Sequence, residues 1–93
     1  MSKIYAGADF TVNLDAGVDL STATTLEIRY IKPDSSTGSK DASYSGTTAS
    51  ADITPTENTS SDYGGWRFYV YAVIDSKILI GETFKQKVTE IGL

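Results

Sequence analysis

The sequence predicts a single all-β domain over residues 1–93, built as an immunoglobulin-like two-sheet antiparallel β-sandwich of about seven strands. Three observations predict this class. The 93 residues suffice for one hydrophobic core but not for two. Apolar residues recur at every second position in several short segments, as they do in half-buried strands. Clusters of Ser, Thr, Gly, Asn and Pro separate these segments at the spacing of a sandwich or barrel.

Two strands are expected in the first third of the chain. The first ends at the turn sequence Asp15-Ala16-Gly17, and its apolar positions are Phe10, Val12 and Leu14. The second covers residues 26–32, and Pro33 ends it because proline cannot donate to a β-ladder. Its core-facing positions are Leu26, Ile28 and Tyr30.

The middle of the chain predicts weaker elements. Residues 40–45 are expected to form a short edge strand, and Ala49, Ala51 and Ile53 alternate in another strand. Residues 34–39 and 56–61 have the composition of surface turns, and the only helix expected is a brief turn near residues 20–24 or 57–63. The triplet Asn58-Thr59-Ser60 fits the N-glycosylation pattern, but such matches are frequent by chance, so we interpret it as a loop.

The clearest strand covers residues 65–74. One face carries Trp66, Phe68, Val70, Ala72 and Ile74, which we assign to the core, and the other carries Arg67, Tyr69, Tyr71 and Val73. A three-residue loop, Asp75-Ser76-Lys77, is expected to lead into a partner strand over residues 78–88. Gly81 indicates a bulge or close packing in it, and its apolar face would hold Ile78, Ile80, Phe84 and Val88.

Composition argues against several functions. Eight Lys and Arg against 12 Asp and Glu give a net charge of −4, so we expect no nucleic acid partner. No segment approaches the length of a membrane-spanning helix and the first residues do not resemble a cleavable leader, so we expect a soluble protein without membrane insertion. The chain has no His and no Cys, which removes the commonest general base and the strongest nucleophile; we expect neither an enzyme nor a cofactor.

Carboxylates leave two chemical alternatives open. Asp9 with Asp15, or Glu82 with Glu90, could form a glycosidase-like pair. Asp15, Asp19 and Asp34 could bind calcium, although the spacing of a calcium loop is absent and turn capping is the simpler interpretation. We therefore predict no metal site.

The residues before the clearest strand form a structural corner. Asp62, Gly64 and Trp66 resemble the run that enters strand F of immunoglobulin domains, where an aromatic residue forms the tyrosine corner. The resemblance implies that Gly64 adopts a backbone conformation a side chain would obstruct, and that the indole N–H of Trp66 bonds a backbone acceptor. Trp replaces Tyr here and the paired cysteines are missing, so the resemblance concerns the fold and not antibody ancestry.

A candidate interaction patch lies on the other face of that strand. Arg67, Tyr69 and Tyr71 would suit a protein partner or, with Tyr44, stacking on a sugar. The alternative is that these side chains pack under a neighbouring strand or loop. The terminal segments, residues 1–5 and Ile91-Gly92-Leu93, are further candidates for docking, with fraying tails as the alternative.

Nearly the whole chain resembles small structural proteins of tailed bacteriophages. The shared motifs, in order, are Ile4-Tyr5-Ala6-Gly7, residues 15–21, Lys32-Pro33-Asp34, residues 64–72 and Gly81-Glu82-Thr83-Phe84. The resemblance implies a virion component of baseplate, tail, neck or capsid-decoration type, synthesised in the bacterial host cytoplasm. It would act as an adaptor or decoration module that binds other virion proteins in symmetric multiple copies. A carbohydrate- or host-surface-binding module of the virion is the alternative.

Overall fold

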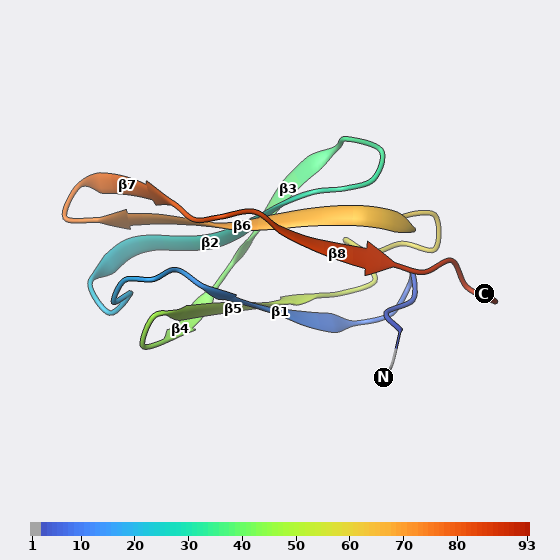
Figure 1. Cartoon of the computed structure of the whole chain (residues 1–93), viewed down its shortest axis with the longest axis horizontal. Helices are drawn as coiled ribbons and strands as arrows, with labels where there is room; N and C mark the ends of the chain where they lie inside the picture. Colours follow the sequence, from blue (N-terminus) through green and yellow to red (C-terminus); the bar gives the residue numbers. More distant parts are fainter. Residues whose placement is uncertain (1–2) are drawn as a thin grey trace.

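A computed structural model describes residues 3–93 and shows two antiparallel sheets packed face to face (Figure 1). The smaller sheet has the order β1-β5-β4, with β1 at Phe10–Asp15, β5 at Thr48–Ile53 and β4 at Ser43–Ser45. The larger sheet has the order β3-β2-β6, followed by β7 and β8 along one edge of β6. Its strands are β3 (Thr37–Asp41), β2 (Ala23–Ile31), β6 (Gly64–Ile74), β7 (Lys77–Ile80) and β8 (Phe84–Val88).

The connections between the sheets follow the immunoglobulin arrangement. The chain crosses from one sheet to the other between β1 and β2, between β3 and β4, and between β5 and β6. In this order β6 takes the place of strand F, and β7 with β8 takes the place of strand G. The predicted sandwich is confirmed, with eight strands among the described residues because the last position is split in two. No helix occurs within residues 3–93; near the two places where a brief helical turn could lie, the chain forms isolated turns, in which the Ala23 amide donates to the Leu20 carbonyl and the Asp62 amide to the Thr59 carbonyl.

The core lies between the sheets, on the face of β6 that the sequence assigns to it. Trp66, Phe68 and Ala72 are 0% exposed and Val70 is 1% exposed, while Ile74 at the strand end is half-buried. The Trp66 and Phe68 rings stack with centroids 5.7 Å apart, and Tyr30 of β2 packs on Trp66 at 5.5 Å. Fully burying one such side chain contributes about 1.5–3 kcal/mol, so this strand anchors both sheets.

The predicted edge strand over residues 40–45 and the predicted turn over residues 34–39 are both partly wrong. Strand β3 begins at Thr37 and pairs with β2, whereas β4 pairs with β5 in the other sheet. Gly38 allows this pairing, since the Tyr30 phenol occupies the space that a side chain at position 38 would fill. These residues thus have the composition of a turn but form a strand, in which Gly38 leaves space for the Tyr30 ring.

The predicted strand over residues 78–88 is also corrected. Its hairpin loop has two residues, Asp75 and Ser76, which both have positive φ (51° and 61°), and Ile74 pairs directly with Lys77. Between β7 and β8 the register on β6 shifts by one residue, near Gly81, where the sequence indicates a bulge. A shift of one residue moves side chains to the opposite face.

That shift separates the four apolar residues expected on one face. Ile78 and Ile80 lie opposite Val73 and Tyr71, on the solvent side of the sheet, and each is 64% exposed. Phe84 lies opposite Phe68 on the inner side but is 47% exposed at the sheet edge. Of the four, Val88 alone is buried.

Candidate interaction face on the five-stranded sheet

The corner before β6 has the predicted geometry. The Nε1–H of Trp66 donates a 2.7 Å hydrogen bond to the backbone carbonyl of Asp62. Gly64 has φ of 129°, and a Cβ there would lie 3.0 Å from the Pro33 side chain. Glycine is therefore required at this position for two reasons, the left-handed φ and the close approach of Pro33.

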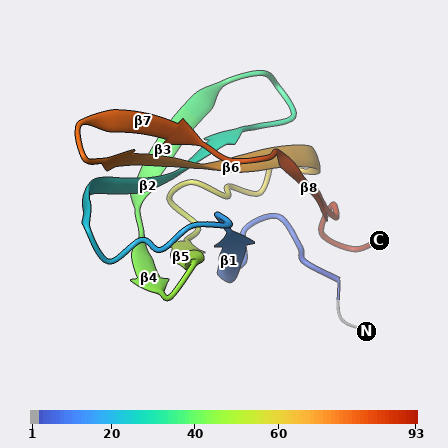
Figure 2. The same ribbon diagram turned by 60° about the vertical axis from the view of Figure 1, so that its left-hand side comes forward.

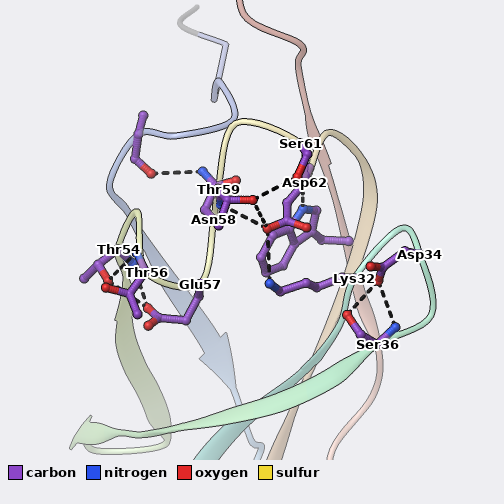
Figure 3. A network of polar contacts seen from close by, with 12 residues as sticks. Lys32, Asp34, Ser36, Thr54, Thr56, Glu57, Asn58, Thr59, Ser61 and Asp62 are labelled. Atoms are coloured by element: carbon purple, nitrogen blue, oxygen red, sulfur yellow. Dashed lines mark hydrogen bonds and ion pairs between the residues drawn. The ribbon is translucent and has the colours of Figure 1, made fainter.

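The Asp62 carboxylate ties this corner to neighbouring loops (Figure 3). Its Oδ2 accepts hydrogen bonds from the Thr59 hydroxyl at 2.7 Å and the Thr59 amide at 3.0 Å, and it pairs with Lys32 Nζ at 3.1 Å. Burial raises the pKa of this carboxyl, but the Thr59 bonds and Lys32 outweigh burial, so the pKa lies below its ordinary value. The charged form of Asp62 is thus part of the folded corner.

Arg67, Tyr69 and Tyr71 share the solvent-facing side of the five-stranded sheet, which we call the outer face. Arg67 is exposed and both tyrosines are half-buried. The guanidinium of Arg29, on neighbouring β2, lies over the Tyr71 ring with Cζ 3.6 Å from its centroid. The structure therefore brings the predicted patch together and adds Arg29 to it, with neither tyrosine covered by a further strand.

One end of the outer face is basic. Lys85 on β8 lies directly opposite Arg67, and Lys87 lies opposite Gly65. None of these three cations forms an ion pair with the described residues. Like charges placed opposite each other on a sheet are unfavourable, so this cluster is a local concentration of positive charge in a chain of net charge −4.

The other end of the outer face is apolar. Ile78 and Ile80 on β7 stand beside Val73 and Tyr71 of β6, with nearly two-thirds of each isoleucine in solvent (64%). Sequence reasoning missed this end because it placed both isoleucines on one apolar face with Phe84 and Val88. The two isoleucines thus form a small exposed apolar group at this end of the outer face.

Tyr44 does not join the outer face. It lies on β4 of the smaller sheet and is 51% exposed. A sugar platform made of Tyr44, Tyr69 and Tyr71 together is therefore wrong, since the first belongs to the other sheet.

The three aspartates considered as calcium ligands cap turns instead. Asp15, Asp19 and Asp34 each accept a hydrogen bond from the backbone amide two residues further on, at 2.8–2.9 Å. These bonds lower the pKa of Asp15 and Asp19, and the Ser36 hydroxyl, followed by the Ser36 amide, lowers the pKa of Asp34. Within residues 3–93, no three acidic side chains come close enough to share a metal ion.

The two carboxylate pairs are not brought together. Asp9 and Asp15 stand before and at the end of β1, which separates them by about 20 Å at the rise of an extended strand. Glu82 and Glu90 lie beyond opposite ends of β8. Neither separation suits a pair that must flank one glycosidic bond.

Asn58 has a structural role that the sequence pattern did not reveal. Its side chain is 0% exposed, and its Nδ2 donates to the carbonyls of Tyr5 at 3.1 Å and Ala8 at 2.9 Å. Its backbone carbonyl accepts from Gly7 at 2.9 Å. Asn58 therefore holds the N-terminal segment, and a buried amide of this kind is not accessible to glycosylation.

The two terminal segments lie at the same end of the molecule (Figures 1 and 2). Tyr5 forms a parallel bridge to Thr89, and its hydroxyl donates to the Leu93 carbonyl at 3.2 Å. Ile91 and Leu93 are 61% and 70% exposed. Of the proposed N-terminal docking segment, residues 1–2 lie outside the described residues; a docking role for either end stays a prediction.

Comparison of the chain with protein-family models, curated proteins and solved structures finds no match. Residues 3–93 contain no helix that is long and apolar enough to cross a membrane. What defines the class of the molecule is therefore its fold, an immunoglobulin-like β-sandwich.

Proposed function

We propose that the chain is a non-enzymatic structural protein of a bacteriophage virion, where it serves as an adaptor or decoration module. The outer face carries this proposal. It combines cations that form no ion pair with the described residues, partly exposed tyrosines and exposed isoleucines on one sheet surface. Arg, Tyr and apolar anchors are enriched where proteins bind proteins.

The motifs that resemble phage structural proteins support the same role independently of the outer face. Asp15, Asp19 and Asp34 cap turns, and Gly64 with Trp66 builds the corner. These motif residues thus maintain the frame that presents the outer face. A frame that presents one interaction face suits a module used in many copies, because symmetric repetition amplifies weak contacts.

The proposal is tested on particles produced by the genome that encodes the chain. We expect the wild-type chain in purified particles at a constant ratio to the other structural proteins, measured by quantitative mass spectrometry. The variant Arg67→Gln/Lys85→Gln should be depleted about tenfold or more, equivalent to about 1.4 kcal/mol of lost binding. Ser43→Glu/Ser45→Glu makes the same change in net charge on the other sheet and should be incorporated normally. If complete, infectious wild-type particles do not contain the chain, the proposal is refuted.

Glycan binding is the second candidate, favoured by the partly exposed Tyr69 and Tyr71. The guanidinium of Arg29 already covers one face of Tyr71, however, and would compete with a stacked sugar. A glycan array with the purified chain separates the candidates. Saturable binding that is lost in Tyr69→Ala and Tyr71→Ala would favour this one, whereas no glycan binding together with incorporation into particles would favour assembly.

A further inference from the structure

Strand β7 is an open edge of the five-stranded sheet (Figure 2). It pairs with β6 on one side only. The two-residue loop closes with the Ile74–Lys77 pair, and hydrogen bonds to β6 then alternate along the strand. Lys77 and Leu79 therefore direct their backbone groups toward β6, whereas Ile78 and Ile80 direct theirs outward, to the open edge.

This edge has less of the usual protection against pairing than β8. Natural edge strands carry charges, prolines or bulges that discourage a second chain. Strand β8, further along, carries two lysines, and the bridge between Tyr5 and Thr89 lies just beyond its end. Strand β7 has a single charge at its first residue, Lys77, and three consecutive apolar residues after it.

We propose that the chain forms a two-fold dimer in which β7 pairs antiparallel with β7 of a second copy. Leu79 would lie opposite Leu79 of the second copy, and Ile78 opposite Ile80 of the second copy. The two five-stranded sheets would become one continuous sheet, and the two outer faces one surface. The inference goes beyond the proposed function, because the purified chain alone tests it.

This register is favoured over its neighbours by the direction of the backbone groups. It places the outward-directed groups of Ile78 and Ile80 against the same groups of the second copy, which allows four hydrogen bonds. A slip of one residue would set outward groups against inward ones. Centring the axis on Ile80 would set Ile78 against the charged Glu82, and centring it on Ile78 would set Ile80 against Ser76 of the loop.

Side chains are complementary in the same register. The four isoleucines would pack together on the outer face beside Val73 and Tyr71, which removes from water two side chains per copy that are each 64% exposed. Lys77 would lie opposite Gly81 of the second copy, so its charge meets no like charge there.

Oxidation of single-cysteine variants tests the register, since the chain has no cysteine of its own. Residues opposite each other in a pair without mutual hydrogen bonds have Cα atoms about 4.5 Å apart, within the range of a disulfide. Leu79→Cys should therefore cross-link to a dimer, whereas Ile78→Cys should not exceed the exposed control Ile91→Cys. Equal cross-linking at positions 78 and 79 would overturn the register.

Sedimentation of the full chain over a concentration series tests the dimer itself. We expect reversible dimers, and Ile78→Thr/Ile80→Thr should raise the dissociation constant at least about tenfold, which is a loss of about 1.4 kcal/mol. Both isoleucines are mostly in solvent, so this variant should stay folded, as circular dichroism would verify. Ile91→Thr is the matched control. A wild-type chain that stays monomeric at all concentrations would overturn the dimer without affecting incorporation into particles.

Discussion

The indole of Trp66 and the backbone carbonyl of Asp62 form a 2.7 Å hydrogen bond at the entry to β6. The donor belongs to a side chain that is 0% exposed in the centre of the core. The acceptor belongs to a residue whose carboxylate binds Lys32 and Thr59. One residue therefore connects the core to the loops that end β2 and lead into β6.

Trp66→Phe removes this bond while keeping an aromatic ring. We expect a loss of about 2–4 kcal/mol in the free energy of unfolding, because a partly buried acceptor loses its partner and the smaller ring leaves a cavity. Urea unfolding monitored by circular dichroism measures the loss. Tyr63→Phe, at an exposed position (45%), should change stability by less than about 0.5 kcal/mol; an equal effect of the two changes would contradict the role of the corner.

Gly64→Ala should destabilise the fold by about 1–3 kcal/mol. Its φ of 129° disfavours any side chain, and the new methyl would press on Pro33 at 3.0 Å. The adjacent Gly65→Ala is the control, since a Cβ there meets nothing within 4 Å. Thermal unfolding of both variants is sufficient, and a larger loss for Gly65→Ala would count against this interpretation.

Asn58→Ala should cost about 2–3 kcal/mol, because the carbonyls of Tyr5 and Ala8 both lose their donor. The N-terminal segment should open locally before the rest unfolds. Hydrogen exchange at the Ala6 amide, which donates to Thr89 at 2.9 Å, reports this opening. Asn13→Ala, on an exposed part of β1, should leave that amide protected; unchanged exchange in Asn58→Ala would contradict the assignment.

Stability should fall in acid. The pKa of Asp62 lies below its ordinary 3.8, and that of Glu57 below 4.5 because the Thr54 amide and Lys40 stabilise its charged form. Groups with a lowered folded-state pKa stabilise the fold above their unfolded-state pKa, and the stabilisation is lost as pH falls through the folded-state pKa. The melting temperature should therefore decline from about pH 5 downward.

Asp62→Asn isolates one contribution to this acid dependence. The variant keeps the backbone carbonyl that accepts from Trp66 but removes the charge that pairs with Lys32. Its melting temperature should be lower near neutral pH and change less between pH 5 and pH 2. An acid profile parallel to that of the wild-type chain would show that Asp62 does not titrate in this way.

Local pattern was sufficient to predict the centre of the molecule. Alternation in residues 65–74 identified β6 and its buried face, and the run from Asp62 to Trp66 predicted the corner with its backbone acceptor. Because these features depend on residues close in sequence, hydrophobic periodicity and one motif are enough to predict them.

The remaining features depend on tertiary context. A register shift of one residue near Gly81 turns Ile78 and Ile80 outward. Gly81 indicates the bulge, but the hydrophobic pattern does not show that the side chains before it change face. The start of β3 depends on Gly38 lying under Tyr30, and the role of Asn58 depends on a partner segment some 50 residues away. As a result, Arg67 and the two tyrosines of the outer face were grouped correctly, while Lys85, Lys87 and the apolar end were not predicted.

An electron cryo-microscopy map of intact particles tests the central claim most directly, namely that the outer face is a surface for assembly. We expect ordered, symmetric copies of the sandwich in which Arg67, Tyr69 and Tyr71 contact a neighbouring protein. A map without the chain, or one in which this face of every copy is in contact with solvent alone, would contradict it.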